Sequence, residues 1–137
     1  MFYALALVGA GLVLYLSWRT HPRMEDVWFI PHWVAVWADE RRNDTLRTAV
    51  PFVALGWLVG GWLWAQNRPW RQWQLAWVAQ VVLVIVAEAG QLFMPERSFD
   101  IADIGWGAVG ALLGLGTVAA LRRLYLALGR GTVREVS

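Results

Sequence analysis

Long apolar runs are the feature that most constrains how this chain can fold. Predominantly apolar stretches of about 17–21 residues recur along its 137 residues, and a helix that crosses a bilayer needs about 20. The composition agrees, because 58% of the residues are hydrophobic and only 16% are charged, whereas soluble domains carry about 25% charged residues. The sequence therefore predicts an integral membrane protein that forms one compact unit over residues 1–137.

The apolar runs predict an all-α fold. The expected spans are residues 2–18, 46–65, 75–93 and 103–121, the last continuing as a helix through Leu128. A further apolar segment, residues 27–38, is too short to span and contains three tryptophans. Because tryptophan prefers the headgroup level, we expect this segment to lie flat on the membrane surface. The prediction is a bundle of about four transmembrane helices plus a short interfacial amphipathic segment between the first and second.

The arginines bear on orientation. All twelve basic residues are arginine. With four spans, six arginines fall on the side of the termini and of the turn at residues 66–74, and six fall on the other side. The positive-inside rule therefore favours neither orientation. Acids are interspersed only among the second group, while the tail offers Glu135 alone. We therefore expect cytoplasmic termini, with the loop within residues 88–103 outside. The absence of lysine, together with many Ala, Gly, Val, Leu and Trp residues, indicates a GC-rich coding sequence and hence a bacterial, multi-pass membrane protein.

Several site classes have no support in the sequence. The chain has no cysteine, which excludes disulfides and thiolate metal ligands. His21 and His32 are eleven residues apart without a matching ligand spacing, so we expect no metal and no cofactor. The net charge is only +2 and the arginines are scattered over loops, which argues against nucleic-acid binding.

The densest charge of the chain lies between two apolar runs. Residues 88–103 contain four acids and one arginine. Glu88 and Gln91 are three apart and share one face of the third predicted span. Glu88 lies roughly 10 Å of helical rise before Pro95, where a charge is costly in hydrocarbon. We therefore expect Glu88 to face the protein interior and to pair with Arg97, whose fork can hold a carboxylate.

The start of the fourth predicted span carries acids followed by glycines. Ser98 or Asp100 followed by Asp103 resembles a capping pattern, and the positive end of a helix favours an acid. Gly107, Gly110 and Gly114 follow Asp103 on one stripe, and the last two form G-x-x-x-G. Small residues allow two helices to approach closely in lipid, so this stripe is expected to pack against the third or second span.

These residues have two interpretations. Glu88, Gln91, Arg97, Ser98, Asp100 and Asp103 can converge as a functional site near one membrane face. The same carboxylates and arginine can instead act as a clasp that fixes the hairpin of the third and fourth spans. The residues alone leave both open, although ionisable residues inside membranes favour a functional role.

The block E-x-x-Q-x-x-x-P-x-R-x-F-D-x-x-D, followed by glycines seven and eleven residues after its last Asp, resembles the VanZ-like family of small bacterial membrane proteins. Its members here are Glu88, Gln91, Pro95, Arg97, Phe99, Asp100, Asp103, Gly110 and Gly114. A weaker match precedes it at Asp44, Phe52 and Gly56, so the best-matching block covers residues 44–116. Thr48, Ala54 and Gly107 depart from the family pattern, in which Asn, Pro and Asn are usual.

The resemblance implies a bacterial inner-membrane protein with a cell-envelope role; the founding member is an accessory protein linked to teicoplanin resistance. One hypothesis is an envelope factor that binds or modifies the headgroup of an envelope lipid or lipid-linked precursor. Arg97 would hold an anionic group, Glu88 would be the candidate acid or base, and the two aspartates would orient them. A second hypothesis is a non-catalytic subunit that docks another membrane protein. A transporter is disfavoured, because no internal repeat is present.

Overall fold

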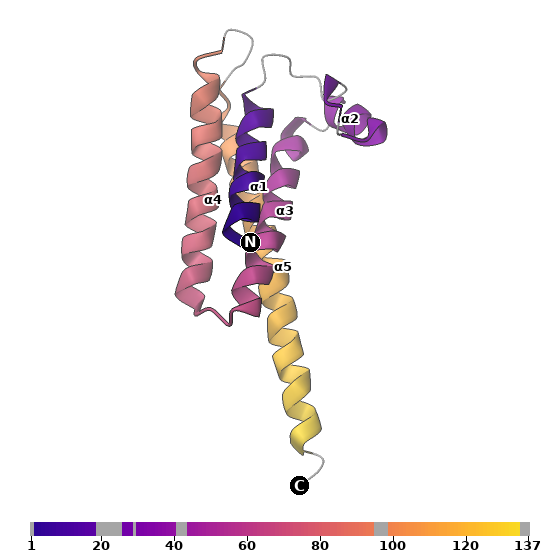
Figure 1. Ribbon diagram of the computed structural model, residues 1–137, viewed down its shortest axis with the longest axis vertical. Helices are drawn as coiled ribbons and strands as arrows, with labels where there is room; N and C mark the ends of the chain where they lie inside the picture. The colour runs from indigo at the N-terminus through magenta and orange to yellow at the C-terminus, as the bar shows by residue number, and fades with distance from the viewer. Residues whose placement is uncertain (1, 19–25, 29, 41–43, 95–98, 135–137) are drawn as a thin grey trace.

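The computed structural model describes residues 2–18, 26–28, 30–40, 44–94 and 99–134, and all of its regular structure is helical (Figure 1). The helices are α1 (Phe2–Ser17), α2 (His32–Asp39), α3 (Asp44–Ala65), α4 (Trp70–Gln91) and α5 (Ile101–Arg134). Helices α1, α3, α4 and α5 run alternately up and down the bundle, while the short α2 lies beside the beginning of α3. The predicted all-α membrane bundle with a short helix between its first two long segments is confirmed.

Among the described residues, three helices are long and apolar enough to cross a membrane. Their apolar windows are Thr48–Ala65, Trp70–Gln91 and Ile101–Leu128. The first predicted span is a shorter apolar helix, because the 16 residues of α1 rise only about 24 Å against a hydrocarbon core of about 30 Å. In Figure 1, α1 accordingly begins part-way along the bundle.

Two boundaries differ from the sequence prediction. The polar turn expected at residues 66–74 is confined to 66–69, and α4 begins at Trp70 after the extended Pro69. The first turn of α4 exposes Trp70 and Arg71 and buries Trp73, and helical structure here satisfies backbone groups that a loop would leave unpaired near lipid. Asn67 takes the left-handed conformation that the tight turn needs, with φ 48°. The last helix is also longer than expected, because α5 continues to Arg134 and extends beyond the turn at residues 66–69 (Figure 1).

The most extensive helix contact is between the parallel α3 and α5. Glycines bring these two backbones together: a Cβ added at Gly56 would lie 2.9 Å from Gly114 Cα and 2.9 Å from Leu115 N. Gly110 sits equally tightly against the backbone of Ala49, and Gly60 faces Val118. The predicted glycine stripe of α5 is therefore used inside the chain, against a second G-x-x-x-G in α3 that the sequence analysis did not single out.

Helix α4 packs on the other face of α5. Val84 fills the space above Gly107, and Trp77 Nε1 donates to the Ala108 carbonyl at 3.1 Å. Two apolar clusters result, one of Val13, Phe52, Val84 and Ala111 and one of Leu63, Trp73, Leu115 and Val118. The first cluster includes Val13 of α1, so α1 is part of the core even though it is shorter than the other bundle helices.

Candidate functional site

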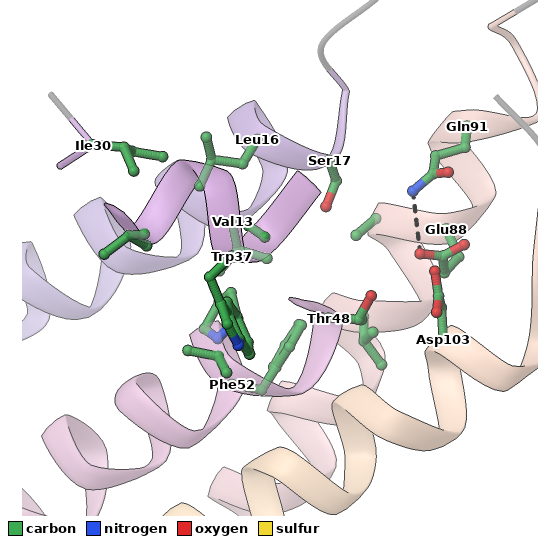
Figure 2. A pocket seen from close by; sticks show the side chains of 16 residues that line it. Val13, Leu16, Ser17, Ile30, Trp37, Thr48, Phe52, Glu88, Gln91 and Asp103 are labelled. Carbon is green, nitrogen blue, oxygen red and sulfur yellow. Dashed lines mark hydrogen bonds between the residues drawn. The ribbon is translucent and has the colours of Figure 1, made fainter. Parts of the chain in front are cut away.

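A cavity of about 210 Å³ lies at the end of the bundle where α1 and α4 end and α3 and α5 begin, with α2 beside it. Figure 2 shows its two contrasting walls. The polar wall contains Ser17, Thr48, Glu88, Gln91 and Asp103. The apolar wall contains Val13, Leu16, Ile30, Trp37 and Phe52. Because the polar wall is drawn from four helices, the fold and not a local motif assembles it.

Glu88 and Gln91 are the most buried residues of the polar wall. Both lie in the last turn of α4, and their side chains are only 2% and 7% exposed. Gln91 Nε2 donates to Glu88 Oε1 at 3.1 Å, as their spacing of three allows. The prediction that Glu88 faces the protein interior is confirmed. The amide fixes the orientation of the carboxyl group, with its oxygens directed into the cavity (Figure 2).

Asp100 and Asp103 have different positions at the start of α5. Asp100 caps the helix: its Oδ1 accepts a hydrogen bond from the Ala102 N–H at 2.8 Å. Its side chain is exposed and is not among the cavity-lining residues. Asp103 is half-buried and lines the cavity, where Figure 2 shows its carboxyl group on the same side as that of Glu88. The structure thus brings Glu88, Gln91 and Asp103 together and leaves Asp100 at the rim as a cap.

The remaining members of the predicted cluster, Arg97 and Ser98, lie outside the described residues. The expected pairing of Glu88 with Arg97 therefore stays a prediction. Within the described residues, no group of three His, Cys, Asp or Glu side chains is arranged to hold a metal ion.

Sequence reasoning missed the walls contributed by α1 and α2. Trp37 and Ser17 reach the cavity from elements whose positions no local pattern reveals. The end of α1 is fixed by Trp18, whose Nε1 donates to the Ala87 carbonyl at 3.0 Å across the surface of Gly90. Thr48 was identifiable in part, since it stands where the resembling family has an amide, and it lines the polar wall.

The cavity is suited to an amphipathic ligand. Carboxyl, amide and hydroxyl groups on one side can accept and donate hydrogen bonds, and carboxyl groups can also transfer protons. The opposite side offers aliphatic and indole surface to an apolar portion. Pockets of this composition, mostly apolar with a few convergent polar groups, are typical of small-molecule and lipid sites.

The fold and the cavity define a small multi-helix membrane protein with a polar pocket at one end of its bundle. The profile of the VanZ/LLP1 family matches residues 2–122. The chain therefore belongs to this family, and the match extends the resemblance of residues 44–116 to the cavity walls from α1 and α2. No curated protein matches the chain. No solved structure matches it either.

Proposed function

We propose that this VanZ-family protein has a cell-envelope role, in which the cavity binds the polar headgroup of an envelope lipid or lipid-linked precursor. The observation that carries the proposal is that the cavity has one polar and one apolar wall. Buried Glu88 and half-buried Asp103 belong to the polar wall. Such a cavity holds a polar head and the beginning of an acyl chain together.

The energetic cost of this arrangement supports a ligand site. A carboxyl group that is 2% exposed near the end of a membrane helix is expensive to bury. A clasp could satisfy it by close packing, yet the cavity beside Glu88 measures about 210 Å³, far above the ~10–15 Å³ that admits one water. An open cavity beside a buried carboxyl group does not stabilise the fold, but it gives a ligand room to bind that group.

Each polar residue has a proposed role. Glu88 is the acceptor for a headgroup hydroxyl or amine and the candidate acid or base in any modification, with Gln91 positioning it. Asp103 and Thr48 complete the polar wall, while the cap at Asp100 holds the first turn of α5 in place. Arg97 is proposed to hold the anionic part of the headgroup, and Ser98, the next residue but one before Asp100, is a further candidate binding residue.

The proposed orientation places the cavity at the outer face of the bacterial inner membrane, with cytoplasmic termini. Arg68, Arg71, Arg122 and Arg123 lie at the turn between α3 and α4 and on the helices beside it, away from the cavity. The arginine counts of the two sides tie, but acids are interspersed only among the arginines of the cavity side, which supports cytoplasmic termini. A cavity at the outer face has access to wall precursors, which is how the protein would affect glycopeptide susceptibility.

A second candidate is a non-catalytic assembly subunit in which the cluster is a structural clasp, favoured by the local hydrogen bonds at the two helix ends. Gln91 donates to Glu88 in the last turn of α4, and Asp100 caps α5, so both helix ends that a clasp would join are ordered. A docking role for the α5 glycine stripe is less supported, because Gly110 and Gly114 already pack against α3 of the same chain.

The test is a comparison by mass of membrane lipids and wall precursors in cells with and without the protein. Cells that express Glu88→Gln or Asp103→Asn should resemble cells without it, although the variant proteins accumulate normally. Asp100→Asn is the matched control, since asparagine also caps helices and Asp100 does not line the cavity. Identical lipid and precursor profiles with and without the protein would overturn the headgroup proposal, and loss of the variants from the membrane would favour the clasp.

A further inference from the structure

The end of the bundle opposite the cavity carries an arginine cluster, defined here as Arg68, Arg71, Arg122 and Arg123. Arg68 belongs to the turn at residues 66–69, Arg71 to the first turn of α4, and the other two to α5. Arg122 joins these elements, since its Nη2 donates to Asn67 Oδ1 at 2.6 Å and its Nη1 to the Arg68 carbonyl at 3.5 Å.

Tryptophans hold the guanidinium groups at this end. Arg68 lies over the Trp62 ring at 5.2 Å, and Arg123 lies over the Trp70 ring at 5.6 Å. The ring of Tyr125 meets Trp64 at 5.9 Å. Cation–π contacts restrain these arginine side chains. Arg68 Nε is buried without a hydrogen-bond partner among the described residues, whereas the exposed Arg123 can offer its N–H groups to an anion. Indoles also prefer the depth of lipid headgroups, so the cluster is fixed at the level where phosphates lie.

The cluster has no acidic counter-charge in the segments that build it. Residues 45–87 and 104–134 contain neither aspartate nor glutamate. The four arginines therefore meet no carboxylate from these segments, and their charge must be balanced by an anion from outside. An exposed basic group near a membrane attracts anionic lipid headgroups, with a contribution of about fivefold in affinity per residue.

The spacing along the helices places the cluster in the headgroup layer opposite the cavity. Asp103 and Arg122 are nineteen residues apart on α5, a rise of about 28 Å. Arg71 and Glu88 are seventeen apart on α4, about 26 Å. Both values approach the hydrocarbon thickness of about 30 Å, so the two charged ends face opposite leaflets. Trp70 and Leu75, both exposed on α4, provide apolar surface for an acyl chain beside the cluster.

We propose that the arginine cluster is a binding site for an anionic phospholipid, which its phosphate group occupies. Guanidinium forks match phosphate oxygens with paired hydrogen bonds, and the arginines come from α4, from α5 and from the turn between α3 and α4, which a single headgroup can bridge. This site is separate from the cavity, so the proposal does not depend on whether the cavity binds an envelope ligand.

The experiment uses the purified full chain in neutral detergent and measures thermal unfolding as phosphatidylglycerol or phosphatidylcholine is titrated in. Phosphatidylglycerol should raise the midpoint at lower concentration than phosphatidylcholine, and salt should weaken the effect. The double variant Arg71→Gln/Arg123→Gln should bind phosphatidylglycerol roughly twenty-five-fold more weakly, about fivefold for each arginine. No hydrogen bond of these two side chains occurs within the described residues, so the fold should persist.

The matched control is Arg42→Gln/Arg47→Gln, which removes the same charge from two arginines that are not part of the cluster, one before α3 in sequence and one in the first turn of α3. This variant should bind phosphatidylglycerol as the wild type does. Equal stabilisation of the wild type by both lipids, or an effect that does not change with salt, would overturn the proposal even if the double variant failed to fold. Equal losses in the two double variants would also overturn it, since charge alone and not the cluster would then be responsible.

Discussion

The two ends of this bundle place their charges in opposite ways. At the cavity end, Glu88 is buried, accepts a hydrogen bond from Gln91 and lies across the cavity from an apolar wall. At the other end, Arg68 and Arg123 lie on indole rings, and the segments around them contain no acid. Aspartate and glutamate side chains are short, so their carboxylates need hydrogen-bond partners close to the helix. Arginine side chains are long enough to extend toward the headgroups. One end is therefore built to enclose a ligand, and the other to meet the membrane surface.

The first and largest expected effect would disrupt both ends at once. In Gly114→Leu the new side chain meets the backbone of Val53 and Gly56, which cannot move aside, so α3 and α5 must separate. We expect a loss of about 3 kcal/mol in the free energy of unfolding, at the upper end of the range for overpacking. Tryptophan fluorescence during thermal unfolding in detergent measures this. Gly116→Leu, where an added Cβ meets nothing within 4 Å, is the control and should stay near wild type.

A second substitution should affect the cavity end alone. Gly90→Ala places a methyl group where the Trp18 indole lies, so the Trp18–Ala87 hydrogen bond is lost and the end of α1 moves off α4. The expected cost is roughly 1–2 kcal/mol, with a loss of headgroup binding and unchanged stabilisation by phosphatidylglycerol. Gly105→Ala is the control, because its surroundings are open. Loss of phosphatidylglycerol binding in Gly90→Ala would show that the ends are coupled.

A third substitution tests the interior between the ends. Gln80 is 4% exposed, and its amide nitrogen and oxygen have no hydrogen-bond partner within the described residues. Leucine has a similar size and no polar group that needs a hydrogen bond, so Gln80→Leu should stabilise the fold by about 1 kcal/mol. The variant should still bind the headgroup in the cavity and phosphatidylglycerol at the arginine cluster. The midpoint of thermal unfolding provides the measurement, and a decrease would mean that the amide contributes to packing or binding.

The smallest effect belongs to the arginine end. Asn67→Gly keeps the left-handed turn but removes the acceptor for Arg122 Nη2, which should cost about 0.5 kcal/mol and weaken phosphatidylglycerol binding slightly, as expected for an exposed pair. Asn67→Ala should cost more, because alanine lacks the local hydrogen bonding that helps asparagine adopt a positive φ. Equal midpoints for the two variants would contradict this account of the turn.

The sequence predicted the helices better than the site. Run length and hydropathy located α3, α4 and α5, and the alternation of polar turns gave the order of the bundle. The spacing of Glu88 and Gln91 predicted their shared face, and the acids before α5 predicted a cap, which Asp100 provides. These features depend on neighbours along one helix, which sequence periodicity reports directly.

The cavity could not be predicted, because it depends on contacts between helices distant in sequence. Trp37 of α2 and Ser17 of α1 line opposite walls of the cavity, and the end of α1 is held there by the bond from Trp18 to Ala87 of α4. The early start of α4 at Trp70 was missed for a related reason: polar residues near the headgroups look like a loop in a hydropathy profile but form helix to satisfy their backbone groups.

The central claim is that the cavity beside Glu88 holds an amphipathic envelope ligand, and filling the cavity tests it most directly. Native mass spectrometry of the protein extracted gently from its own membrane would compare the wild type with Thr48→Phe, which places a ring in the cavity, and with Ala120→Phe on an exposed face of α5. The account predicts a co-purifying species in the wild type and Ala120→Phe that is absent from Thr48→Phe. The same bound species in all three proteins would contradict it.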